Sequence, residues 1–156
     1  MAEEQIESVD DAISQWVTFT LDDEAYGINV MQVQEVLSMP EITPVPGAPS
    51  HIMGIINLRG HVVTVIDTRL RLGIGPKTPD ASNRVIVIET DDQIAGILVD
   101  SVAEVANIGD AQIETAPDVG NQECAHYIHG VVSRDNMLLI LLDSIRLLAA
   151  QEWAQR

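Results

Sequence analysis

The chain has 156 residues, 46% hydrophobic and 3% aromatic, so it can bury a core of Val, Ile and Leu in one compact domain or two small subdomains. Lys and Arg number 8 against 24 Asp and Glu, and the formal net charge of −16 disfavours binding to nucleic acid or to an anionic membrane surface. The single cysteine, Cys124, excludes an internal disulfide and fits a reducing, cytoplasmic compartment. No apolar run approaches the roughly 18 residues of a membrane span.

The first residues, 1–14, form an acidic arm without the apolar region of a signal peptide, and we expect this arm to be disordered. Strands are predicted over 15–21 and 25–29, on either side of an acidic turn. Residues 30–37 are predicted to form a short helical or irregular segment, in which Glu35 is surrounded by apolar side chains.

Residues 54–67 predict a β-hairpin, because two apolar strands flank a tight turn at 57–60. Gly60 can take the positive φ that such a turn often needs. Arg59 has no packing role at the tip of a hairpin. Its guanidinium is therefore available to meet a carboxylate or the carbonyl groups of a partner.

Two stretches of the first half recur in the second half. Residues 22–36 align with 91–105 at an offset of 69, and eight of the fifteen pairs are identical. Residues 54–73 align with 130–149 at an offset of 76, with matching aliphatic positions. Because both matches occur in the same order, they indicate a tandem duplication.

Each copy contains two strands, a short segment, a Pro-bearing loop and a hairpin. Short strands joined by tight turns are typical of small closed barrels, because closure removes exposed sheet edges. We therefore predict a mostly β fold with subdomain 1 over 15–75 and subdomain 2 over 83–142, joined by the Gly- and Pro-rich linker 73–82. The strand 137–142 is apolar on both faces, so it is predicted to lie between the two barrels.

A C-terminal helix is predicted over 143–155, with Asp143 as its N-cap. Four apolar residues are expected to form one stripe on this helix: Ile145, Leu148, Ala149 and Trp153.

The sequence lacks a nucleophile elbow, a phosphate-binding loop and a dinucleotide fingerprint. The nearest approach to a metal site is Cys124, His126 and His129, but structural zinc needs four ligands, so surface or half-buried histidines are favoured. The acidic turns at 22–24 and 91–92 lack the spaced ligands of a calcium loop. We therefore predict a binding module without catalytic residues, metal or cofactor.

The segment around Val33 and Glu35 has two interpretations. It is either a core-facing short helix with one exposed acid, or an apolar groove in which a partner helix docks, with Glu35 on the rim. If the two copies pack with approximate two-fold symmetry, Val102 and Val105 supply the opposite wall.

The chain resembles the CheW family of bacterial chemotaxis adaptors over about residues 15–150. The Asn-Leu-Arg-Gly turn followed by Val-Ile-Asp is specific in combination. The resemblance rests on the following motifs: 15–19, 26–30, 33–36, 42–46, 52–60, 65–69 and 97–105.

This resemblance implies two small SH3-like, five-stranded β-barrel subdomains packed on a shared core, plus short helices. It implies a non-enzymatic scaffold that couples methyl-accepting chemoreceptors to the histidine kinase CheA in cytoplasmic arrays at the membrane. The receptor's helical tip docks in the groove between the barrels, and the kinase's homologous regulatory domain pairs with a barrel end. A CheW-like adaptor of a pilus-linked or other chemosensory system is the alternative.

By motif, the resemblance carries roles to individual positions. Thr68 departs from the family, which more often has Leu there. The receptor-facing positions are Val33, Glu35, Gly54, Arg59, Val102 and Val105. The turn-shaping and barrel-closing positions are Asn57, Gly60, Asp67, Arg69 and, by the repeat, Asp143.

Two other function classes fit the sequence less well. A small metal-dependent enzyme would have to use Cys124, His126 and His129, and bound metal in the purified protein would reveal it. A nucleic-acid-binding barrel is opposed by the net charge of −16 and the scarcity of aromatic residues on which bases stack.

Overall fold

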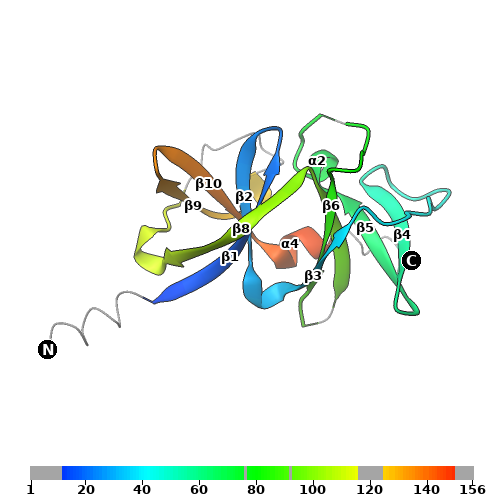
Figure 1. Cartoon of the computed structure of the whole chain (residues 1–156), viewed down its shortest axis with the longest axis horizontal. Helices are drawn as coiled ribbons and strands as arrows, with labels where there is room; N and C mark the ends of the chain where they lie inside the picture. Colours follow the sequence, from blue (N-terminus) through cyan, green and yellow to red (C-terminus); the bar gives the residue numbers. More distant parts are fainter. Residues whose placement is uncertain (1–11, 76, 92, 116–124, 150–156) are drawn as a thin grey trace, which may run out of the picture.

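The computed structural model describes residues 12–75, 77–91, 93–115 and 125–149, and ten strands carry the fold in these ranges (Figure 1). The strands of the first half are β1 (Ile13–Leu21), β2 (Glu24–Asn29), β3 (Val33–Ser38), β4 (Ile52–Leu58) and β5 (His61–Asp67). Those of the second half are β6 (Arg84–Glu89), β7 (Ile94–Val99), β8 (Ser101–Gly109), β9 (Ile128–Arg134) and β10 (Met137–Leu142). Short helical elements are η1 (Val30–Gln32), α2 (Thr68–Arg71), η2 (Asp110–Gln112) and α4 (Ser144–Leu148).

The strands form two five-stranded sheets, ordered β8-β1-β2-β10-β9 and β3-β6-β7-β5-β4. We call them the β1 barrel and the β6 barrel. The β6 barrel is joined across its edge strands by paired backbone hydrogen bonds of 2.9 and 2.8 Å between Thr43 and Ile55. Glu114 and Val131 do the same in the β1 barrel, with 2.9 and 2.8 Å bonds. The mostly β architecture of two SH3-like subdomains agrees with the prediction.

Each sheet combines two strands of one sequence copy with three strands of the other. The sheets therefore do not follow the predicted boundaries 15–75 and 83–142, because β3 and β8 cross from one barrel to the other (Figure 1). Two copies of one unit have identical pairing edges, so β1 and β2 can accept the later strands of either copy. The interleaved arrangement ties the two barrels together through the chain itself.

The two barrels have the same strand registers, related by the offsets of 69 and 76 found in the sequence. In the parallel β5–β7 pair Val65 lies opposite Gly96, and in the parallel β10–β2 pair Leu141 lies opposite Gly27. The structure is therefore pseudo-two-fold at the level of the backbone. Residues related by these offsets are called counterparts below.

Apolar side chains form one core shared by the barrels and one core inside each barrel. The shared core takes side chains from both sheets, for example Phe19 of β1 and Ile97 of β7. On β10, Ile140 joins the shared core and Leu139 joins the core of the β1 barrel. This alternation confirms the prediction that the strand 137–142 lies between the two barrels.

The segment predicted to be helical or irregular, 30–37, is mainly a strand, and so is its counterpart in the second copy, which lies in β8. Only Val30–Gln32 is helical, as the 3-10 helix η1. The pairing of β3 with β6 shifts register between Val33 and Glu35. The pairing of β8 with β1 shifts register at the equivalent place, between Val17 and Phe19 of β1. Such bulges break the period-2 alternation of apolar residues, so the sequence pattern imitated a helix.

The ends of the chain differ in part from the predictions. β1 starts at Ile13, inside the predicted arm 1–14, while residues 1–11 lie outside the described ranges. Asp143 is the N-cap of α4, and its carboxylate accepts the Ile145 and Arg146 amides at 3.0 and 3.2 Å. The described α4 is Ser144–Leu148, and the rest of the predicted helix, including Trp153, lies outside the described residues.

The predicted apolar stripe on the C-terminal helix is wrong for Ile145 and Ala149. Ile145 is 63% exposed, and Ala149 is exposed as well. α4 instead packs Ser144, Leu147 and Leu148 inward, so Ile145 falls on the outer face.

Candidate functional site

The clearest polar contact on the surface of the β6 barrel joins Arg59 to Glu35. Arg59 donates from Nη1 to Glu35 Oε2 at 2.5 Å and from Nη2 to Oε1 at 2.8 Å, a bidentate pair. The side chains are 68% and 23% exposed, respectively. The hydrogen bond from Arg59, and then its charge, lower the pKa of Glu35 below its ordinary value. The predicted availability of Arg59 for a carboxylate is therefore met within the chain.

Local backbone geometry places Arg59 at the tip of the hairpin. Arg59 and Gly60 are the two central residues of the turn, with φ of 53° and 86°. A positive φ at both positions suits the twist of a two-residue hairpin loop, although it is uncommon for Arg. The Asn57 side chain accepts the Gly60 amide at 2.8 Å and holds the turn from within β4.

Gly54 lies on the edge strand β4, where this strand meets the segment after β3. Its φ is +153°, and a Cβ placed there would lie 2.2 Å from the carbonyl oxygen of Thr43. Any side chain would therefore break the bond between Thr43 and Ile55 that closes the barrel. Glycine is required at this position by backbone contact.

The predicted apolar positions separate into two pairs. Val33 and Val102 are counterparts at the two bulges, and both pack partly buried against the shared core. Val105 on β8 and its counterpart Val36 on β3 are 50% and 40% exposed. The two crossing strands therefore present equivalent apolar positions. That Val102 and Val105 form the opposite wall of one groove stays a prediction.

Asp67 and Arg69 hold the end of the β6 barrel. Asp67 is the N-cap of α2 and accepts the Leu70 amide at 3.2 Å, while burial raises the pKa of its carboxyl group. Arg69 is buried and donates to Asp100 Oδ2 at 3.0 Å, to the Gly75 carbonyl at 2.8 Å and, as an ion pair, to Asp22 Oδ1 at 2.8 Å. Because Asp22 belongs to the β1–β2 turn, Arg69 links the two barrels.

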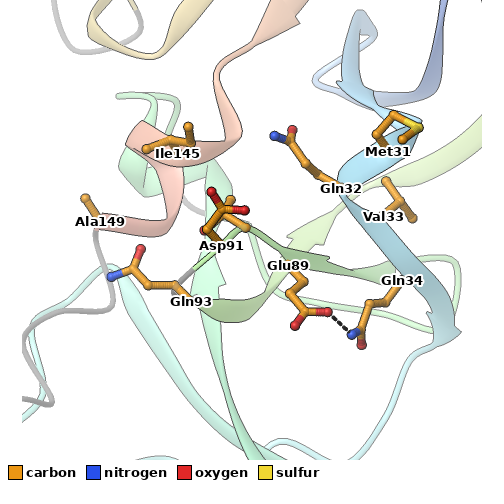
Figure 2. Close-up of a pocket in the computed structure, with 10 residues that line it drawn as sticks. Met31, Gln32, Val33, Gln34, Glu89, Asp91, Gln93, Ile145 and Ala149 are labelled. Atoms are coloured by element: carbon orange, nitrogen blue, oxygen red, sulfur yellow. Dashed lines mark hydrogen bonds between the residues drawn. The ribbon is translucent and has the colours of Figure 1, made fainter.

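Val33 also lines a cavity of about 890 Å³ between η1, the β6–β7 turn and α4 (Figure 2). Sequence reasoning missed this cavity. The repeat contains a sign of the cavity, because two charged residues are replaced in the other copy. The counterpart of Arg69 is Ile145, and that of Asp100 is Met31. These mismatches lie at the cavity.

No group of three or more potential metal ligands comes together within the described ranges, which include His126 and His129 but not Cys124. The His126 ring meets Tyr127 edge-on at 4.8 Å, and His129 lies 5.7 Å from Trp16. Among the described helices, none has the length and apolar character needed to cross a bilayer.

Comparison with known proteins identifies the family. Residues 15–152 match the family model described as a CheW-like domain. Proteins named "Chemotaxis protein CheW" are 32% identical over 93% of this chain and 88% of theirs in Treponema pallidum, and 33% identical over 90% of this chain and 84% of theirs in Klebsiella aerogenes. The crystal structure of the scaffolding protein TtCheW from Thermoanaerobacter tengcongensis superposes with a TM-score of 0.77 at 36% identity, covering 83% of this chain and 88% of that one. The chain belongs to the CheW family of non-enzymatic chemotaxis scaffold proteins.

Proposed function

We propose that this chain couples methyl-accepting chemoreceptors to the histidine kinase CheA in the cytoplasm, at receptor arrays on the membrane. Support comes from the family, whose members are named chemotaxis proteins and, in the solved structure, a scaffolding protein. The observation that carries the proposal is the surface bidentate pair of Glu35 and Arg59, in which Arg59 lines a shallow hollow together with the exposed apolar Val62. Such a mixture of a polar pair and apolar side chains is typical of a protein-binding surface.

The proposed receptor surface contains Val33, Glu35 and Arg59 on the β6 barrel, with Val102 and Val105 on the crossing strand β8. Gly54 has a structural role instead, because its close backbone contact with Thr43 shapes the edge of the β6 barrel. We expect Gly54 to act on receptor binding through folding and the other residues to act by contact.

The kinase's regulatory domain is proposed to pair with a barrel end. The tip of the β9–β10 hairpin supports this, because Met137 and Leu138 are 62% and 46% exposed. A barrel end with exposed apolar side chains suits a homologous domain that carries the same hairpin. The carboxylate of Asp135, in the turn, would set the charge of this contact.

The test is a binding titration of the purified chain against a receptor cytoplasmic fragment and against the CheA regulatory domain. Arg59→Ala and Glu35→Ala are expected to weaken receptor binding at least tenfold while circular dichroism and melting stay unchanged. Glu41→Ala, at an exposed acid in the loop after β3, is the matched control. Full receptor affinity in both variants would overturn the site. Co-purification from cells then shows whether a flagellar or a pilus-linked system is served.

A further inference from the structure

The pseudo-two-fold fold has two equivalent notches between its barrels, and one of them is filled from within the chain. In that notch the guanidinium of Arg69 lies between Asp22 and Asp100, at 2.8 and 3.0 Å. The Asp22 amide also donates to Asp100 Oδ2 at 2.9 Å, so the charges and the backbone form one closed cluster. Arg69 is 8% exposed, and its side chain fills the space.

The other notch keeps one acid of this cluster and loses its cation. The counterpart of Asp22 is Asp91, whereas those of Asp100 and Arg69 are Met31 and Ile145. All three line the cavity of about 890 Å³. Figure 2 shows Met31 of η1 on one side, Ile145 of α4 on the other and Asp91 between them. Met31 is 87% and Ile145 63% exposed, so the notch is open and its walls are partly apolar.

The charge of this notch is not compensated by the part of the chain that the structure describes. Glu89 and Asp91 take part in none of the ion pairs found there, which involve Arg59, Arg69 and Arg146 as cations. Glu89 accepts a hydrogen bond from the neutral Gln34 side chain (Figure 2). Two carboxylates beside exposed Met31 and Ile145 are complementary to a lysine or arginine side chain, which carries a cation at the end of an apolar methylene chain.

We propose that this notch receives an arginine or lysine side chain from the tip of the chemoreceptor, in the position that Arg69 occupies in the filled notch. The cation meets Asp91 and Glu89, and apolar side chains next to it on the receptor cover Met31 and Ile145. Methionine suits such a contact because its flexible side chain adapts to the partner. This inference rests on the proposed function and adds a second contact to the receptor surface, with which the notch is continuous through Val33.

The first experiment reverses the charge of the notch and measures receptor binding at two salt concentrations. The double variant Glu89→Lys with Asp91→Lys is expected to bind the receptor fragment at least tenfold more weakly, with a smaller salt dependence than the wild type. Glu41→Lys, an equal charge change per site on the loop after β3, is the control and should bind within twofold of the wild type. A double variant that binds as well as the wild type would overturn the proposal.

The second experiment fills the notch from within. Ile145→Arg places a guanidinium at the counterpart position of Arg69 and is expected to lower receptor affinity at least tenfold, whereas Ile145→Leu keeps the wall apolar and should retain it. Circular dichroism and melting confirm that both variants fold. Unchanged binding by Ile145→Arg would contradict the proposal, and so would a change in sedimentation by any notch variant, because it would show that a second copy occupies the notch.

The two failures are distinguishable because the Arg59→Ala variant and the wild type are titrated alongside. If the wild type does not bind the receptor fragment, the proposed function is wrong. If the wild type binds and Arg59→Ala weakens it while all notch variants bind normally, only the notch proposal fails. An Arg→Glu or Lys→Glu change in the receptor that restores binding to the Glu89→Lys, Asp91→Lys variant would identify the cation.

Discussion

Glu35 and Arg59, 24 residues apart in the sequence, form a bidentate pair on the surface of the β6 barrel, while their counterparts Glu104 and Asp135 in the β1 barrel are both acidic. Both barrels close through the same backbone bridges. The pair is therefore not needed for closure. It gives one barrel an acid paired with a cation where the counterpart positions of the other barrel carry two acids, so the surfaces at the two positions differ in charge.

Replacing Arg59 with Gln is expected to return the pKa of Glu35 upward to its ordinary value. The hydrogen bonds and charge of Arg59 hold that pKa down, and a neutral amide cannot supply the charge. Because the pair lies at the surface and Arg59 is 68% exposed, the melting temperature should change little. Titration of the Glu35 side chain by NMR in the two proteins checks this. An unchanged Glu35 pKa in the variant would show that the pair does not form in solution.

Gly54→Ala should destabilise the fold much more than Gly60→Ala, although both glycines have positive φ. A Cβ on Gly54 meets the Thr43 carbonyl oxygen at 2.2 Å, whereas a Cβ on Gly60 meets no atom within 4 Å. We expect a loss of about 1 kcal/mol at Gly60, from backbone conformation alone, and about 3 kcal/mol at Gly54. Urea denaturation measures both. Equal losses would mean that the β4 edge yields to the new methyl group.

Arg69→Met should cost about 3 kcal/mol of stability, because it leaves the partly buried Asp100 without its cation. Arg146→Met is the control, since its side chain is 54% exposed and its ion-pair distance to Asp143 is 3.8 Å. The control should lie within about 0.5 kcal/mol of the wild type. Denaturation curves of the two variants give the comparison. An Arg69→Met variant as stable as the control would show that the barrels do not depend on this cluster.

Much of the fold could be predicted from residue patterns because those patterns are local. The two-sided apolar strand 137–142 indicated its place between the barrels, and Asp143 before a helix indicated its N-cap. The strand exchange could not be predicted in this way. Each copy offers the same pairing edges, so the apolar residues of β3 and β8 carry no information about whether these strands join β6 or β1.

The site could be predicted in part. At a hairpin tip Arg59 is available for a carboxylate or for the carbonyl groups of a partner, and the resemblance puts Glu35 on the same surface. The pair itself could not be predicted, because a bulge in β3 obscures the strand pattern that brings the two residues together. The notch could not be predicted from the identical residues of the repeat. It is marked instead by two positions at which the copies differ, Ile145 and Met31. Such differences acquire meaning only when the fold shows that Arg69 and Asp100 meet.

The charge on Asp67 is expected to lower stability as the pH rises. Burial is the main cause that raises its folded-state pKa, and the Leu70 amide opposes it in part. Since the folded state holds this proton more tightly than the unfolded state, stability is greatest below the ordinary pKa of Asp and falls as the pH passes through the raised value. Asp67→Asn removes the charge and still caps α2, so its stability relative to the wild type should increase as the pH rises from below the ordinary pKa of Asp, about 3.9, to pH 7.

Asp67→Ala separates the cap from the charge. Without a side-chain acceptor for the Leu70 amide, this variant should lose about 1 kcal/mol relative to Asp67→Asn at every pH. Urea denaturation of the three proteins at several pH values, from about 3.5 to 7, provides the measurement. If the stability of Asp67→Asn relative to the wild type instead falls as the pH rises, then the negative charge stabilises the barrel end, and attraction to the neighbouring Arg69 outweighs the cost of burial.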